Sequence, residues 1–147
     1  MRRSWLLAPV VVVLVGGLSL AAVAAAGGET LSERQWRKKT NVICERGEKL
    51  TRELQQDIFG ELKRDAQPSL EQMTAYVDGV EPILDNVADG IAALREPKAL
   101  EKKVKRFVRA MRRDIDRVVG DPSLGLEGNP FSDTTLAAEA LRLKSCS

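Results

Sequence analysis

The sequence predicts an all-α protein: an apolar N-terminal transmembrane or signal helix, then an antiparallel up-down-up bundle of three long helices and a short C-terminal helix, stapled by a disulfide. The first observation is compositional. Hydrophobic residues make up 44% of the chain but aromatic residues only 4%, which favours aliphatic helix packing over a β-sandwich. The second is that apolar residues recur at helical spacing in three long segments. The third is the pair of widely separated cysteines in a chain with an export leader.

The leader consists of Arg2 and Arg3 followed by an uncharged stretch over residues 4–28. About 20 apolar residues span a bilayer, so residues 4–26 would cross the membrane if the leader is not cleaved. The small-residue triplets within "AVAAA" also fit a signal-peptidase site, and secretion after cleavage is the alternative. The Arg pair predicts a cytoplasmic N-terminus, although basic residues between positions 34 and 39 weaken this bias. We therefore expect a signal-anchor or signal peptide over 1–28 and an extracytoplasmic domain over 29–147, located at the cell membrane as a single-pass protein.

The first long helix is predicted over residues 32–64. Thr30 with Glu33, or Ser32 with Gln35, would form a capping box at its start. Gly47 lies on the apolar face, which indicates close approach of another helix. The predicted face comprises Trp36, Thr40, Ile43, Gly47, Leu50, Leu54, Ile58 and Leu62.

The second long helix is predicted over residues 69–95, after Pro68 and with Ser69 and Gln72 as its capping box. Its apolar residues alternate in steps of three and four, as in a coiled-coil seam. They are Leu70, Met73, Val77, Val80, Leu84, Val87, Ile91 and Leu94.

The third long helix is predicted over residues 98–119 and ends at the Gly120-Asp121-Pro122 stop. Its apolar face comprises Leu100, Val104, Phe107, Met111, Ile115 and Val118. A Gly/Pro-rich connector follows, and a short last helix capped by Asp133 or Ser132 carries Leu136, Ala140 and Leu143.

Charge is distributed unequally between the second and third helices. Residues 69–96 carry a net charge of −5 and residues 97–119 a net charge of +6. Opposite charge favours antiparallel pairing of these neighbours. A functional alternative is that Lys102, Lys105, Arg109 and Arg112, which share the face opposite the apolar one, bind an anionic lipid or wall polymer.

Composition also excludes several classes of function. The chain has no histidine, which removes the commonest general base and transition-metal ligand. Beyond the leader it carries 21 basic and 21 acidic residues, so we expect no nucleic-acid partner. No catalytic, cofactor-binding or metal-binding motif is present, and we therefore expect no cofactor and no enzymatic activity.

The two cysteines, Cys44 and Cys146, are 102 positions apart. An even cysteine count in an exported chain indicates a structural disulfide between them. Free buried thiols, a metal site and a redox-active pair are the alternatives, and the wide separation argues against the last. The up-down-up order would let the tail return along the bundle to Cys44.

The chain resembles a group of small exported actinobacterial proteins in its apolar leader, its Val42-Ile43-Cys44 motif and its C-terminal "ALRLKSCS". The tail of that group follows A-x-x-[aromatic]-G-L-x-x-C-G. Leu143 and Cys146 match it, whereas Leu141, Arg142 and Ser147 replace the aromatic and the two glycines. The resemblance implies the disulfide and the export, and implies no specific function.

These observations lead us to expect a non-enzymatic binding or structural role in the cell envelope, with an envelope protein or an anionic polymer as partner. The alternatives are binding of anionic surfaces through the basic helix, and carriage of a small apolar ligand between the helices. A sizeable apolar cavity would favour the carrier, and the oligomeric state stays open.

Overall fold

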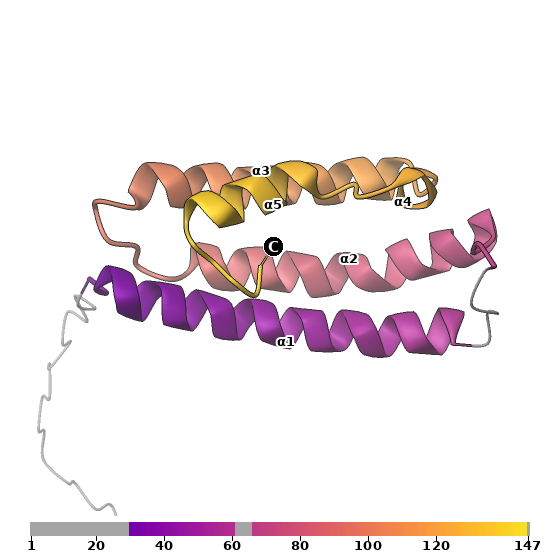
Figure 1. Ribbon diagram of the computed structural model, residues 1–147, viewed down its shortest axis with the longest axis horizontal. Coiled ribbons are helices and arrows are strands. Elements are labelled where there is room, and N and C mark those ends of the chain that lie inside the picture. Colours follow the sequence, from indigo (N-terminus) through magenta and orange to yellow (C-terminus); the bar gives the residue numbers. More distant parts are fainter. Residues whose placement is uncertain (1–29, 61–65, 147) are drawn as a thin grey trace, which may run out of the picture.

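The computed structural model describes residues 30–60 and 66–146, and within them every regular element is a helix. The long helices are α1 (Glu33–Phe59), α2 (Leu70–Ala92) and α3 (Glu101–Gly120). Two short helices follow, α4 (Leu124–Glu127) and α5 (Ser132–Ala140), of which α4 lies in the predicted connector. Figure 1 shows α1 beside α2 and the short α5 beside α3, with the C-terminal tail returning toward α1. The predicted all-α class is confirmed.

Capping boxes set the start of α1 and α2. Ser32 Oγ accepts a hydrogen bond from the Gln35 amide, and the Gln35 side chain accepts one from the Ser32 amide. Ser69 and Gln72 repeat this arrangement at α2. Each box satisfies amides that no helical carbonyl can reach. Both starts agree with the sequence prediction.

The three long helices pack antiparallel to their neighbours in the chain. A Cβ built on Gly47 of α1 would lie 2.4 Å from Val87 Cγ2 of α2, so Gly47 does mark a close approach. Between α2 and α3, Arg112 donates to Asp89 at 2.7 Å, which gives the predicted opposite-charge pairing one direct contact. Helix α5 packs on α3 rather than on α1.

The core lies along the inner faces of the helices, and the predicted face of α3 is buried in full. Three predicted core leucines are nevertheless exposed: Leu50 (44%), Leu70 (55%) and Leu136 (62%). In α1 the buried residues include Cys44, so the buried face is rotated relative to the predicted one. Leu50 lies at the edge of that face and points outward. Leu70 is the first residue of α2 and extends past the core, while α5 packs through Ala137 and Ala138 instead of Leu136.

No helix within residues 30–60 and 66–146 combines the length and the apolar character needed to cross a bilayer. The predicted leader over 1–28, with its membrane segment 4–26, lies outside the described residues, as do Leu62 and the predicted end of the first helix at residue 64. Helix α1 ends at Phe59.

Candidate functional site

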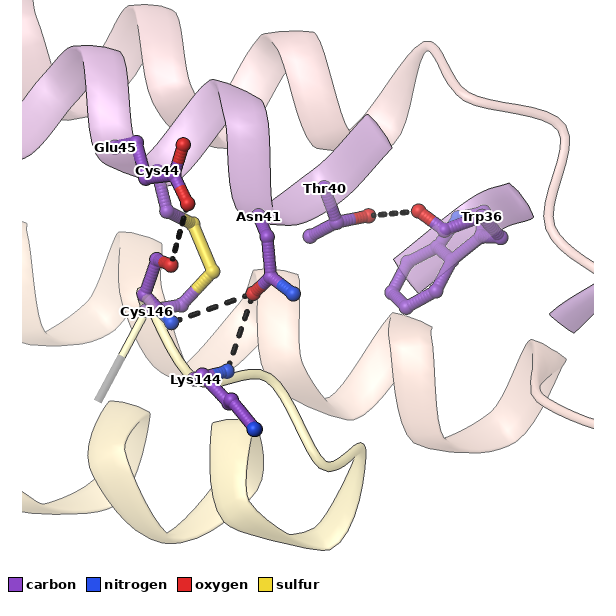
Figure 2. The surroundings of a disulfide bond; sticks show 8 residues. Trp36, Thr40, Asn41, Cys44, Glu45, Lys144 and Cys146 are labelled. Atoms are coloured by element: carbon purple, nitrogen blue, oxygen red, sulfur yellow. Dashed lines mark hydrogen bonds between the residues drawn. A yellow bond between two sulfur atoms is a disulfide. The ribbon is translucent and has the colours of Figure 1, made fainter. Parts of the chain in front are cut away.

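A disulfide joins Cys44 in α1 to Cys146 in the C-terminal tail, as predicted (Figure 2). The two Cα atoms are 5.3 Å apart, within the ordinary range for this bond. Cys44 is buried and Cys146 half-buried. The bond ties the end of the described chain to the middle of the first helix.

Polar contacts hold the same tail against α1. Asn41 Oδ1 accepts hydrogen bonds from the backbone amides of Lys144 (3.1 Å) and Ser145 (3.3 Å) (Figure 2). Ser145 Oγ donates to Glu45 at 3.0 Å, and Arg37 Nε donates to the Leu141 carbonyl at 2.9 Å. The tail is therefore fixed over more than one turn of α1, not at the sulfurs alone.

On the N-terminal side of Cys44 the bundle is filled. Trp36 and Leu141 are fully buried, and Leu143 is 3% exposed. These side chains belong to one core cluster with Phe107 of α3 and Ile91 of α2. Trp36 is thus a core residue, as its position on the predicted apolar face of the first helix indicated.

On the C-terminal side of Cys44 the bundle contains a groove of about 770 Å³. One wall is α1, which contributes Glu48, Thr51 and Gln55. The opposite wall is the segment from Gly125 to Thr135. The groove exists because α5 is short and packs on α3, so that no long fourth helix from the described part of the chain separates these two walls.

Apolar side chains from α2 and α3 form the floor of this groove. Val77 is 2% exposed and Val80 4% exposed, although both line the hollow. Met73 and Val118 continue the floor and are also buried. Because these side chains are nearly inaccessible, the apolar surface that the groove exposes comes from half-buried lining residues such as Leu84 and Phe131.

The walls above the floor are polar but carry little charge. Their neutral polar groups come from Thr51, Gln55, Asn129 and Thr135, and Glu48 is the single charged side chain among the described lining residues. Glu48 also lies 3.7 Å from Arg52, an exposed ion pair along α1. The chemistry of the groove is therefore an apolar trough with neutral hydrogen-bonding groups along its rims.

An aromatic pair lines the groove near the end of α1. The rings of Phe59 and Tyr76 have centroids 5.2 Å apart and are tilted by 47°. Burial raises the pKa of the Tyr76 hydroxyl above its ordinary value, because the ionised form would be poorly solvated there. The disulfide lies at the other end, where Cys44, Ser145 and Cys146 line the groove.

The predicted basic face of α3 is exposed in the structure, at Lys102, Lys105, Arg109 and Arg112. Two of these side chains form ion pairs with carboxylates: Lys105 with Glu101 at 2.5 Å, and Arg112 with Asp89 at 2.7 Å. The hydrogen bond from Lys105 lowers the pKa of Glu101, and the same contact raises the pKa of Lys105. The face is thus a partly neutralised stripe.

No three His, Cys, Asp or Glu side chains within the described ranges are placed to hold a metal ion. Sequence reasoning did not predict the groove, although one signal for it is present. Thr51 and Gln55 follow Cys44 on the inner side of α1, where a closed core would have apolar residues.

No protein-family model, curated protein or solved structure matches this chain.

Proposed function

We propose that this protein is an exported, membrane-tethered helical bundle that binds a small, elongated apolar molecule in the groove between α1 and residues 125–135. The activity is non-enzymatic binding. The observation that carries the proposal is the groove of about 770 Å³ with its apolar floor and uncharged polar rims. Binding sites for small molecules generally have 300–1,000 Å³ and this kind of lining.

The size of the groove favours a small molecule over a protein partner. Its volume of about 770 Å³ lies in the range that is usual for small-molecule sites. A hydrocarbon chain would contact the half-buried apolar side chains that line it, among them Phe59, Tyr76 and Leu84.

The lining also bears on the polar group of the ligand. Glu48 would repel an anionic group at the disulfide end of the groove, while Thr51, Gln55 and Asn129 offer neutral donors and acceptors. A neutral amphiphile, such as a long-chain alcohol, matches this chemistry. Its chain would replace water against the half-buried apolar lining, and its hydroxyl would bond to a rim.

Export is supported by the leader and by the cysteines. Arg2 and Arg3 precede an uncharged stretch as in a signal-anchor, and disulfides persist in oxidising compartments outside the cytosol. N-terminal sequencing of the mature protein tests this part: the intact N-terminus supports the anchor, whereas a start near residue 27 supports secretion.

The binding test is a titration of the full-length chain with a straight-chain primary alcohol, followed by native mass spectrometry. Thr51→Trp would fill the groove and should weaken binding at least tenfold. Leu50→Trp is the matched control, because Leu50 directly precedes Thr51 in α1 but is exposed and does not line the groove. Absence of a complex with the unmodified protein, or equal affinity of both variants, would contradict the proposal.

The anionic-surface alternative is supported by the exposure of the basic face of α3, and is weakened by the carboxylates that pair with Lys105 and Arg112. It predicts salt-sensitive binding to anionic vesicles that is lost when Lys102, Arg109 and Arg112 are changed to Glu. No binding at low salt would exclude it.

A further inference from the structure

The groove is closed at its disulfide end, and an inference about ligand length drawn from this closure rests on the proposed function. At the disulfide end, Cys44, Ser145 and Cys146 form part of the lining. Directly behind them the bundle is solid, because Trp36, Leu141 and Leu143 fill the space between the helices. An apolar chain in the groove therefore cannot extend past the disulfide.

The wall at this end is held in place by independent contacts. The disulfide fixes Cys146 on Cys44, while Asn41 accepts two amide hydrogen bonds from the tail. The Ser145 hydroxyl bonds to Glu45. A tail restrained at three consecutive residues forms a rigid boundary, not a flap that a ligand could push aside.

We propose that the Cys44–Cys146 bond and the tail around it form an end wall that limits the length of apolar chain the groove accepts. Cys44 and Phe59 both line the groove and are 15 residues apart in one helix, which corresponds to about 22 Å. Past Phe59 along the chain, the described residues add only Ala66 and Pro68 before α2 to the lining, so the apolar surface open to a longer chain is limited. Ser145 and the disulfide are thus determinants of ligand specificity.

This arrangement predicts a break in the dependence of affinity on chain length. Each methylene buried against the apolar lining should tighten binding about fourfold, from the usual transfer free energy of about 0.8 kcal/mol. Once the chain reaches from the wall to the far end of the groove, further methylenes remain in water and affinity should stay constant.

The experiment measures dissociation constants of the full-length chain for primary alcohols of increasing length by native mass spectrometry. Ser145→Trp thickens the wall and should move the break to a shorter alcohol, with about fourfold weaker binding of longer ones for each methylene displaced. Lys144→Trp is the matched control: it adds an indole at the adjacent, exposed position and should leave the break unchanged. A double Cys44→Ala, Cys146→Ala variant, if folded, should move the break to a longer alcohol by no more than the space that the two sulfurs vacate, since Trp36, Leu141 and Leu143 close the bundle behind them.

The outcomes separate this inference from the proposed function. If the unmodified protein binds alcohols but shows no break, or if Ser145→Trp leaves the break where it was, the end wall is overturned and the binding function stands. If no alcohol binds the unmodified protein, the proposed function fails and the end wall with it. The Ser145→Trp comparison decides even if the cysteine variant does not fold.

Discussion

The carboxylate of Asp114 in α3 caps the first turn of α5 through Thr134. Asp114 Oδ2 accepts hydrogen bonds from the Thr134 amide at 3.0 Å and from its hydroxyl at 2.8 Å, and both residues are buried. Helix α5 has no side-chain cap of its own, since Phe131 stands at its N-cap position. The other oxygen of Asp114 accepts from Arg117, which also donates to the Pro130 carbonyl. One side chain of α3 thus supplies the cap and positions the wall of the groove.

Replacing Asp114 by Ala should destabilise the protein by about 1–3 kcal/mol, because the buried Thr134 amide loses its acceptor. Denaturant unfolding measures this change. Asp116→Ala is the control: Asp116 lies on the same helix but is exposed, and its loss should stay within about 0.5 kcal/mol. Equal effects of the two substitutions would show that Asp114 does not act as a cap.

Gly47→Ala should destabilise the bundle by about 1–2 kcal/mol. The added methyl would lie 2.4 Å from Val87 Cγ2, and relieving this overlap requires either a rotation of the stiff Val87 side chain or a shift of α1 away from α2. Gly120→Ala in α3 is the matched control, because nothing lies within 4 Å of a Cβ at that position. There, helix propensity should stabilise by up to about 1 kcal/mol. Thermal unfolding that shows the same sign for both changes would argue against the close contact.

Arg142→Gly should stabilise the protein by about 1 kcal/mol. Arg142 follows the end of α5 with φ of 57°, a left-handed conformation that favours glycine. The Leu143 amide bonds back to the Ala138 carbonyl at 3.0 Å, which holds this turn in place. Chemical denaturation of the two proteins checks the sign. A loss of stability would mean that the Arg142 side chain contributes more than its backbone conformation costs.

Tyr76 offers a spectroscopic probe of the groove, because it is the only tyrosine in the chain. Burial raises the pKa of its hydroxyl above the usual value of about 10, so its contribution to stability is present below that pH and is lost as pH rises through the folded-state pKa. Tyrosinate absorbance should therefore appear at higher pH in the folded than in the denatured protein. A bound alcohol should raise this pKa further, and Tyr76→Phe should remove the signal and this part of the alkaline destabilisation.

Reducing the disulfide should lower stability by up to about 4.7 kcal/mol, the chain-entropy value for a loop of about 100 residues. Unfolding measured with and without a dithiol reductant tests this. A Cys44→Ser, Cys146→Ser variant is the control, since it should match the reduced protein and should not respond to reductant.

Local patterns were enough to predict most of the fold. The capping boxes that begin at Ser32 and Ser69 correctly predicted the starts of α1 and α2. The spacing of apolar residues from Leu100 to Val118 predicted a face that is buried in full. Periodicity failed at Leu50, Leu70 and Leu136, where an apolar residue at helical spacing faces water. Spacing tells which residues share a face, but the neighbouring elements decide which part of that face is covered.

The sequence by itself determined the helical class, the order of the long helices and the pairing of Cys44 with Cys146, because caps, helical periodicity and cysteine count are properties of the chain alone. The tertiary structure decided where the short last helix packs. Asp114 holds α5 on α3 and the disulfide ties the tail to α1, so the bundle is solid around Trp36 and hollow beyond Cys44. A groove is the space between elements, and no pattern along one element specifies it.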